Sequence, residues 1–385
     1  MDNVLLKLQF MDLDFCAGHY VNQGYYKAFI PKEINREWII SDMEVFQLLS
    51  SADRQLGRLD MYSEYVNIDL FIKTHIANEA TLSSRIEGTQ THIEDAFLEE
   101  ELINMEHRDD WKEVQNYIEA MHSSINLLTK LPLSNRLIRD THSILLSGVR
   151  GKHKEPGQFR TSQNWIGGSN IDNAVFVPPP HTEVPRLMSD LELFIHNNDV
   201  KMPDLLKIAI IHFQFETIHP FLDGNGRVGR LLITLYLVAK GILRQPILYL
   251  SAYFERNRSM YYEYLMRART ENDINSWLKF FLKGVIETSK NGVATFDNIL
   301  SIQRTLDERL SPLGSSAHDG KLILNEMFDK PVRSAKEIRG IIGKSDASTY
   351  KLIEKMEQIG VLKEITGAQR NKRYAFQEYL SLFDK

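Results

Sequence analysis

The sequence has 385 residues, 43% hydrophobic and 25% charged, which is typical of a packed globular protein with two or three domains. A net charge of −5 argues against bulk binding to nucleic acid or to an anionic membrane. The only cysteine, Cys16, excludes an intrachain disulfide, residues 1–14 lack the basic segment of a signal peptide, and the longest apolar run, 231–239, is too short to span a bilayer. These features predict a cytoplasmic protein with no membrane partner.

Most of the N-terminal part of the chain is predicted to be helical. Residues 1–40 are rich in aromatic side chains but show no clean period, and we predict no element there. Beyond them, apolar residues recur with the spacing of one helical face. This spacing predicts helices over residues 42–58, 61–86, 108–129 and 134–146.

Glu87 is unusual in this pattern because it falls at the C-terminal end of a predicted helix. Gly88 is the expected stop of that helix, and Thr91 with Glu94 forms a capping box that predicts the start of the next one. An acid at a helix C-terminus opposes the helix dipole at a cost of roughly 0.3–1 kcal/mol. A capping box with Ser84 or plain solvation would explain Glu87 structurally, whereas a basic partner elsewhere in the fold would give it a function.

Residues 158–180 change in character from helical to β-prone. Two short pieces, 162–166 and 174–177, flank a turn rich in Gly, Asn and Asp, and three prolines close the segment. This pattern predicts a β-hairpin with a long loop. The hairpin is either a surface ribbon or an edge that binds an extended target segment by β-augmentation.

The most concentrated chemistry lies in residues 219–230, HPFLDGNGRVGR, between two apolar segments of helix length, 205–218 and 228–242. Glycines where the second helix should start let the backbone approach a ligand closely. Free N–H groups at a helix start bind anions, and successive amides can form a nest for phosphate oxygens. Arg227 and Arg230 lie three residues apart and point roughly the same way. The loop therefore predicts a polyphosphate cradle that carries two arginines.

Two further residues of this loop fit phosphate chemistry. Asp223 can hold Mg²⁺, which binds through one or two carboxylates and keeps its waters, and His219 titrates near neutrality, so it is the candidate general base. A dinucleotide-binding fingerprint is excluded because a helix precedes the glycines and no acid follows between residues 224 and 254. The Gly-Lys-Ser/Thr pattern of a P-loop is absent. A merely structural corner would not need so many functional groups.

The rest of the chain predicts closing helices and a small C-terminal domain. Aromatic residues in 251–265 recur at helical spacing, which indicates core packing more often than a ligand wall. Residues 311–320 have the Pro, Gly and Ser content of a linker. Three short helices and then a β-hairpin follow, which is the order of a winged helix-turn-helix domain. The first helix is expected over 321–328, the second begins at a capping box of Ser334 and Glu337, and the third covers 346–359. The two strands of the hairpin are expected over 361–365 and 372–376.

A winged helix suggests DNA binding, but the charge pattern does not favour it. From His318 to Lys385 there are 13 Lys and Arg against 10 Asp and Glu, a difference of +3. The third helix carries two lysines and three acids, a net charge of −1, where a recognition helix should be basic. We therefore expect a protein-contact or structural role for this domain, with DNA binding as the alternative.

The motif His219-Pro-Phe-x-Asp-Gly-Asn-Gly-Arg-x-x-Arg230 resembles the complete signature of the Fic family. Members of this family typically transfer AMP from ATP to a hydroxyl group of a target protein. Ser83-x-x-x-Glu87-Gly88 resembles the inhibitory helix motif that some Fic proteins carry upstream of the catalytic core. The resemblance covers residues 40–290 and implies a Fic-like helical core.

The resemblance also implies a role for each motif residue. His219 would be the base, Asp223 the Mg²⁺ ligand, and Glu87 the inhibitory partner of Arg230. The hairpin of residues 158–180 would be the flap that clamps the target peptide. Ser83 and Gly88 would complete the inhibitory motif, and ATP would be bound by Gly224, Asn225, Gly226, Arg227, Val228, Gly229 and Arg230 and, around the adenine, by Asn257 and Tyr262.

We therefore predict a mostly α protein with three parts. These are an N-terminal helical region with the regulatory helix over residues 1–110, a Fic catalytic core with a β-hairpin flap over 111–310, and a winged helix over 318–385. The predicted function is a protein adenylyltransferase that uses ATP and Mg²⁺, modifies a Ser, Thr or Tyr hydroxyl of a target protein or of itself, and is inhibited by Glu87. Removal of AMP, transfer of another nucleotide, and a nucleotide-sensing DNA-binding regulator are the alternatives, and the sequence leaves a homodimer open.

Overall fold

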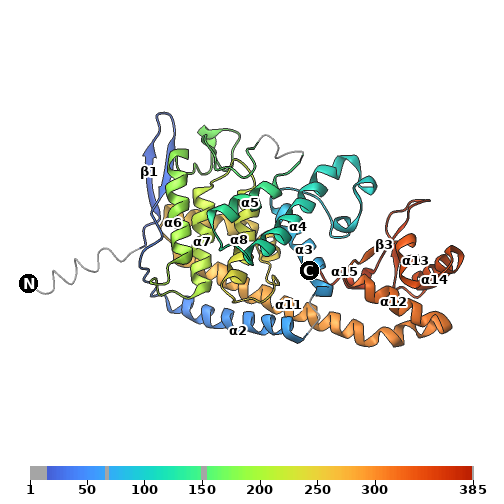
Figure 1. Cartoon of the computed structure of the whole chain (residues 1–385). Coiled ribbons are helices and arrows are strands. Elements are labelled where there is room, and N and C mark those ends of the chain that lie inside the picture. The colour runs from blue at the N-terminus through green and yellow to red at the C-terminus, as the bar shows by residue number, and fades with distance from the viewer. Residues whose placement is uncertain (1–14, 66–68, 149–153, 384–385) are drawn as a thin grey trace, which may run out of the picture.

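The structure, a computed structural model, describes residues 15–65, 69–148 and 154–383. Residues 1–14, on which the prediction about a signal peptide depends, lie outside the described residues. So do residues 66–68, which belong to the helix expected over 61–86. The described chain is mostly helical with small antiparallel sheets, as Figure 1 shows, which confirms the predicted fold class at that level. Among the described residues, no helix combines the length and the apolarity that a membrane crossing requires.

A β-hairpin near the N-terminus was not predicted. Strands β1 (Gly18–Asn22) and β2 (Lys27–Pro31) pair antiparallel, with Gly18 opposite Pro31. Phe29 of β2 is buried in the core, and its backbone N–H donates to Val177 O at 3.0 Å. Strands of five residues leave too short a pattern to stand out, which is why the sequence showed no clean period there.

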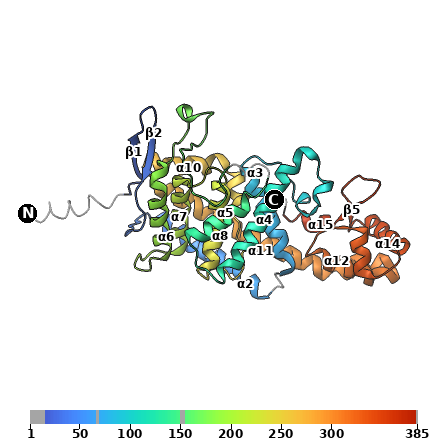
Figure 2. The same ribbon diagram turned by 45° about the horizontal axis from the view of Figure 1, so that its top comes forward.

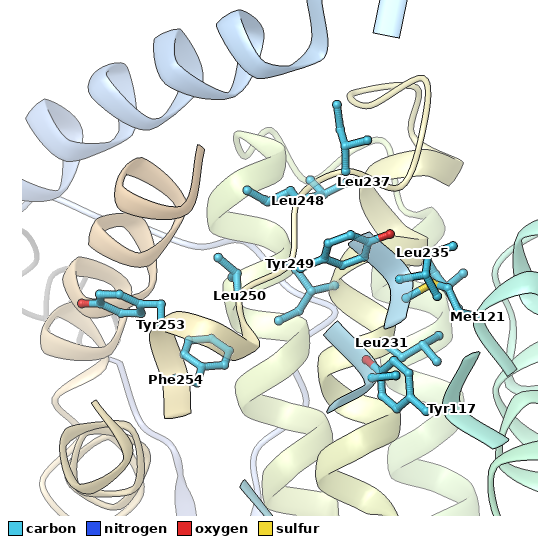
Figure 3. Packing of buried hydrophobic residues seen from close by; sticks show 14 of the residues in the cluster. Tyr117, Met121, Leu231, Leu235, Leu237, Leu248, Tyr249, Leu250, Tyr253 and Phe254 are labelled. Atoms are coloured by element: carbon cyan, nitrogen blue, oxygen red, sulfur yellow. The ribbon is translucent and has the colours of Figure 1, made fainter. Parts of the chain in front are cut away.

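Two antiparallel helices form the centre of the molecule. Helix α7 (Asp204–Ile218) is buried on all sides from Leu205 onward and is largely apolar, although Lys207, His212 and Glu216 are buried with it, and α8 (Asn225–Ala239) packs beside it. Figure 3 shows Leu231 and Leu235 of α8 beside Tyr117 and Met121, which belong to α4. The helices around this pair in the same layer are α4 (Arg108–Leu128), α5 (Asn135–Leu145) and α6 (Val184–His196).

Longer helices cover the central pair. The 37-residue helix α11 (Ile274–Leu310) runs along α2 (Met43–Tyr65), and both follow one edge of the molecule in Figure 1. Helix α3 (Asp69–Ile86) contacts α4, α8 and α9 (Ser251–Arg256), and α10 (Arg258–Thr270) lies against α11. The C-terminal end of α3 is thereby brought to the start of α8.

The connection from α3 to α4 differs from the prediction. The capping box of Thr91 and Glu94 does not begin an α-helix, so that prediction is wrong. Three short 3₁₀ helices occupy the connection instead, because the side chain of Asp95 accepts from His92 N at 3.1 Å and starts a turn. They are η1 (Asp95–Phe97), η2 (Glu100–Leu102) and η3 (Met105–His107).

The predicted flap is a loop rather than a pair of strands. Only Ile166 and Phe176 form a β-bridge in the flap, and no ladder extends from it within these described residues. Between them, the side chain of Asn170 accepts from the backbone of Asp172 and Asn173 and caps the 3₁₀ helix η4 (Ile171–Asn173). Beyond the bridge the backbone bonds elsewhere, since Val177 O accepts from Phe29 N and Pro178 O accepts from the side chain of Gln163, and the expected β-hairpin is reduced to a single bridge.

The segment expected to be a linker is ordered secondary structure. After α11, the 3₁₀ helix η6 (Ser311–Ser316) leads directly into α12 (Ala317–Met327), and Leu313 is buried between them. A three-stranded antiparallel sheet in the order β3-β5-β4 then packs with two helices. Its elements are β3 (Val332–Ser334), α13 (Ala335–Ile342), α14 (Asp346–Gln358), β4 (Lys363–Glu364) and β5 (Arg373–Ala375), followed by α15 (Gln377–Leu380). Membership of the winged helix class stays a prediction.

This C-terminal part rests on α3, as the two ribbon views agree (Figures 1 and 2). The ring of Phe71 contacts Phe328 edge to face at 5.5 Å, and His75 contacts Phe383 at 4.8 Å. Lys73 pairs with Asp329 at 2.7 Å. The helix that carries Ser83 and Glu87 at one end is therefore held by the C-terminal part at the other.

Candidate active site

The loop between α7 and α8 is shaped by its own backbone and by one asparagine. His219 ends α7 in the left-handed conformation, at φ 50°, and Gly224 adopts φ 75° just before α8 begins. The side chain of Asn225 donates to Phe221 O and accepts from Phe221 N, both at 2.8 Å. Asn225 therefore contributes its side chain to the loop, and only its backbone amide is available to a ligand.

Two residues that we did not predict hold this loop from the flap side. Arg160 is 2% exposed, and its Nε donates to His219 O at 3.0 Å while its backbone N–H donates to Pro220 O at 2.9 Å. Asn164 donates from Nδ2 to Phe221 O at 2.8 Å. The carbonyl groups of the loop are thus bonded from one side, which fixes the position of the His219 ring.

His142 supports the loop from α5. Its ring stacks on Phe221 at 3.7 Å between centroids, and Gly157 N donates to its Nδ1 at 2.8 Å. Since Nδ1 accepts, Nε2 carries the proton and donates to Asp223 O at 3.0 Å. Burial lowers the pKa of His142 to about 4, so the neutral tautomer that these bonds require is present at neutral pH.

The predicted partners Glu87 and Arg230 meet in the structure. Arg230 Nη2 donates to Glu87 Oε1 at 2.7 Å, and the same guanidinium donates to Ser83 Oγ at 2.9 Å and Ser83 O at 2.8 Å. Burial acts to raise the pKa of Glu87, but Arg230 outweighs it and the pKa is lowered overall. The carboxylate is therefore ionised at neutral pH and tied to a guanidinium whose side chain is 2% exposed. Gly88, at φ 108°, ends the turn as expected.

The Glu87 carboxylate lies directly on the glycine-rich cradle. A methyl group built at Gly226 would lie 2.3 Å from Glu87 Oε1 and 2.9 Å from Arg230 Nη1, so only glycine admits this approach. Because α8 starts at Asn225, its first N–H groups have no intrahelical partner and the helix dipole favours an anion there. Glu87 thus occupies an anion site at the start of α8.

Glu87 also separates two cavities. One, of about 260 Å³, is lined by His219, Gly226, Arg230 and flap residues 165–167. The other, of about 240 Å³, is lined by Asp223, Arg227 and Glu113. Both are smaller than the pockets of about 300–1,000 Å³ that usually hold a nucleotide-sized ligand. Because Glu87 lines both, removing its carboxylate would join them.

His219 has the properties of a base that is neutral at neutral pH. Its pKa is lowered to about 3, first by burial and then by the positive charges of Arg269 and Arg160. Its Nδ1 is buried without a hydrogen-bond partner among the described residues. An unprotonated ring nitrogen beside the cradle can accept a proton, and bound phosphate groups would raise its proton affinity.

Asp223 and Arg227 form the other side of the site. The side chain of Asp223 is 43% exposed, and its Oδ1 lies 3.7 Å from Arg227 Nη2 and accepts from Gly224 N at 2.6 Å. Arg227 Nη1 donates to Glu113 at 2.9 Å. Among the described residues, no three His, Cys, Asp or Glu side chains form a metal cage. One accessible carboxylate beside a phosphate site nevertheless fits Mg²⁺, which needs few protein ligands.

Five of the predicted nucleotide contacts line neither cavity, namely Gly224, Asn225, Val228, Gly229 and Asn257. The side chain of Val228 is buried in the core, and Gly229 packs against Glu216 with its carbonyl bonded to His212. Asn257 joins α9 to α10 by donating to Tyr253 O at 2.9 Å. Val228 and Gly229 lie in α8 and Asn257 lies between α9 and α10, and their contacts with a nucleotide stay predictions. Tyr262, in contrast, lines the cavity that contains His219 and Arg230.

The structure adds cavity-lining residues that the sequence did not reveal. Glu216, one turn before His219 on α7, is 6% exposed, and its Oε1 has no partner in the described chain. Burial raises its pKa to about 7, although Arg230 opposes the change. Tyr261 and Arg269 of α10 complete the wall. The one local signal in the sequence was the acid Glu216 inside the largely apolar segment 205–218. No such signal distinguished Tyr261 or Arg269.

The sequence matches two domains of a known protein family and parts of two named relatives. Residues 46–126 match the Fic/DOC family N-terminal domain and residues 132–237 match the Fic/DOC family domain. The protein adenylyltransferase Fic of Drosophila ananassae is 30% identical over 156 residues, 40% of this chain and 28% of that protein. A probable protein adenylyltransferase of Aquifex aeolicus is 41% identical over 114 residues, 29% of this chain and 31% of that protein. In both cases the match spans less than a third of the relative's length.

A solved structure shares the fold. The crystal structure of a Fic family protein from Desulfovibrio desulfuricans G20 superimposes with a TM-score of 0.57 at 20% sequence identity, and covers 89% of this chain and 98% of that one. At this identity the similarity concerns the fold alone. The two matched domains contain α3 and the loop of residues 219–230, the segments that build the site described above. On these grounds residues 46–126 and 132–237 are the two domains of the Fic/DOC family.

Proposed function

We propose that the protein is a protein adenylyltransferase, which transfers AMP from ATP to a hydroxyl group of a target protein. One observation carries the proposal: the Glu87 carboxylate is held by Arg230 against Gly226, where the start of α8 favours an anion. A position that accepts a carboxylate in this way is also suited to a phosphate group. The names of the relatives in Drosophila and Aquifex support the same activity.

In the proposed reaction, the polyphosphate of ATP lies on the first amides of α8, with Arg227 and Arg230 beside it. The oxygen of a Ser, Thr or Tyr hydroxyl bonds to the α-phosphorus while the bond to the pyrophosphate oxygen breaks. His219 accepts the hydroxyl proton, and pyrophosphate leaves with the electron pair of the broken bond. Asp223 would hold Mg²⁺, which would neutralise part of the negative charge of the phosphates.

The flap is proposed to position the target. Residues 165–167 line the cavity that contains His219, and the bridge of Ile166 and Phe176 leaves the rest of the flap backbone without a strand partner. Trp165 and Val175, each next to a residue of the bridge, are 42% and 65% exposed and offer apolar contacts beside it. An extended target segment could add to this edge and place its hydroxyl near His219.

Glu87 is proposed to inhibit the reaction by competing for Arg230. A guanidinium that pairs with a carboxylate cannot offer the same N–H groups to an outer phosphate of ATP. A bound nucleotide would then be displaced along the cradle, and a misplacement of about 1 Å can lower a rate on the order of 10²-fold. The wild-type protein is therefore expected to be weakly active.

The experiment that tests the activity uses ATP labelled in two positions. The Glu87→Gly variant is incubated with Mg²⁺ and a cell lysate, and label on protein is measured with α-labelled and with γ-labelled ATP. Kinases of the lysate also transfer the γ-label, so each signal is compared with lysate that lacks the variant, and AMP transfer predicts variant-dependent incorporation from the α-label only. Adding His219→Ala should remove that incorporation, by about 10²–10⁴-fold, while ATP still binds. Variant-dependent incorporation from the γ-label, or full transfer without His219, would refute the proposal.

Hydrolytic removal of AMP from a modified protein is the second candidate. It is favoured by the Glu87 carboxylate, whose side chain is 35% exposed and faces both cavities, because such a group can orient an attacking water. Protein modified by the Glu87→Gly variant is purified and mixed with wild-type chain. Release of AMP by wild type but not by Glu87→Gly would support removal, and stable modification would exclude it.

The division into three parts also stays a proposal. We propose boundaries at residues 1–110, 111–310 and 318–385, with the last part as a winged helix that contacts protein. Its support is the order of α12, α13 and α14 before the hairpin of β4 and β5. Asp346 at the start of α14 pairs with Arg339, so part of the basic charge near that helix is already neutralised, which agrees with a weak attraction to DNA.

A further inference from the structure

Helix α3 has a second functional face. Ser83 and Glu87 lie four residues apart and face Arg230, whereas Leu82 and Arg85 lie on the other side of the helix. The face of α3 turned away from the candidate active site lines a cavity of about 760 Å³, larger than either cavity beside Glu87. The proposed reaction makes no use of this cavity.

The walls of this cavity come from segments far apart in the sequence. Its floor is α3, its rim is the connection of residues 89–107, and α9 and Phe383 close the remaining sides. The connection is itself held from both sides: Trp111 of α4 donates to Asp95 O at 2.9 Å, and Arg373 of β5 donates to Glu99 at 2.9 Å. The cavity is therefore built by fixed elements and not by a loose surface loop.

Two polar groups of this lining lack adequate partners. Arg85 is half-buried and pairs with no carboxylate in the described chain, and its closest acceptor is Thr91 O at 3.4 Å. Thr89 is 4% exposed, and its Oγ1 has no hydrogen-bond partner among the described residues. Thr89 Oγ1 is enclosed and out of reach of a ligand, whereas Arg85 lines the cavity without a carboxylate, so the cavity suits a group that pairs with a guanidinium.

The rest of the lining restricts the class of that ligand. Asp95, an acid of the rim, already accepts from His92 N, and Asn78, Gln90 and Asn104 add amide groups to the lining. Glu255 lies on the opposite wall, on α9. Apolar side chains complete the lining and suit an organic body, namely Leu82, Ile93, Leu102, Ile103 and Phe383. The volume is that of a site for a small organic molecule.

We propose that this cavity is a second ligand site, which takes a small organic anion on the back of the regulatory helix. The acidic group of the ligand pairs with Arg85, and its body packs between Ile93 and Phe383. Arg85 lies two residues before Glu87 in the chain, so the ligand acts on the end of α3 that carries Glu87. A ligand that binds this arrangement more tightly than the one with Arg230 released stabilises the pair of Glu87 and Arg230, and hydrogen exchange at the end of α3 measures this difference. This consequence rests on the proposed function, whereas binding itself does not.

The test uses the fluorescent anion anilinonaphthalene sulfonate as the probe, titrated into the full-length protein. Arg85→Gln removes the charge, Ala252→Phe fills the cavity from α9, and Arg54→Gln, an exposed residue of α2 that bonds only Ser51, is the control. We expect one saturable site whose affinity falls about tenfold in each of the first two variants and is unchanged in the control. Circular dichroism and the unfolding temperature confirm that each variant is folded.

Equal affinity in all four proteins, or an equal loss in Arg54→Gln, overturns the site. Binding lost in Arg85→Gln but kept in Ala252→Phe also overturns it, because the probe would then lie outside the cavity. Hydrogen exchange tests the action on α3. With saturating probe, the amides of Gly88 and Thr89, which donate to Arg85 O and Ser84 O, should exchange more slowly. Unchanged exchange would leave the site standing and refute its action on Glu87. Neither measurement depends on AMP transfer.

Discussion

Replacing Glu216 by glutamine should stabilise the protein above neutral pH. Glu216 is 6% exposed, its Oε1 has no partner in the described chain, and burial raises its pKa from 4.5 to about 7. The nearby Arg230 favours the charged form, but it is already paired with Glu87. Ionising Glu216 in the folded protein is therefore unfavourable, and glutamine keeps the shape of the side chain without the charge.

The size and sign of the effect follow from the two pKa values. Because the folded pKa lies above the unfolded one, the stability linked to Glu216 is complete below pH 4.5 and is lost as the pH rises through about 7. A difference of about 2.5 pKa units corresponds to on the order of 3 kcal/mol. Glu216→Gln should thus exceed wild type by up to this amount at pH 8 and approach it at pH 5.

Urea unfolding at both pH values measures the difference. The comparison requires equal slopes of unfolding free energy against urea in the two proteins, so that only stability has changed. Glu101→Gln, at an exposed acid of η2, is the matched control and should show no pH-dependent gain. If Glu216→Gln is no more stable than wild type at pH 8, or gains equally at pH 5, the buried carboxyl is not ionising as the structure indicates.

Two other predictions concern the site. Asp223→Asn should raise the Mg²⁺ concentration needed for half-maximal AMP transfer in the Glu87→Gly background, since a neutral amide is a poor Mg²⁺ ligand, and an unchanged midpoint would exclude Asp223 as the ligand. Ser83→Ala removes the hydroxyl that accepts from Arg230 Nε at 2.9 Å and should raise transfer by up to about tenfold, less than Glu87→Gly does; activity equal to wild type would mean that Ser83 does not help to hold Arg230.

The sequence predicted two kinds of site residue. Some belong to one continuous motif, and one, Glu87, stands where its own helix disfavours its charge. The cradle at the start of α8 was predictable because glycines and arginines crowd one turn between two apolar segments. Glu87 was noticeable because an acid stands at a helix end, and the structure places it on Arg230. The sequence also predicted the mostly helical fold, since long apolar periods leave little ambiguity.

What the sequence did not predict depends on contacts between distant segments. Arg160 and His142 hold the loop of residues 219–230 from other elements, and no local pattern distinguishes them from surface residues. The capping box at Thr91 was wrong because Asp95 offers the competing turn, and the flap lacks a ladder because Val177 O and Pro178 O accept from Phe29 N and from the side chain of Gln163. The structure of such short segments is determined by polar side chains that bond to nearby backbone groups. Which backbone group each side chain bonds depends on how the segment packs against the rest of the fold.

Glu87 is proposed to inhibit AMP transfer by pairing with Arg230, so that this guanidinium cannot bind the phosphates of ATP. The most direct measurement is AMP incorporation from α-labelled ATP by wild type, Glu87→Gly, Arg230→Ala and the double variant, at equal concentrations of folded protein. We predict that Glu87→Gly exceeds wild type by on the order of 10²-fold and that the double variant loses this gain, because the released guanidinium is what positions the phosphates. Incorporation by Glu87→Gly no greater than by wild type, or a gain that survives the loss of Arg230, would contradict the claim.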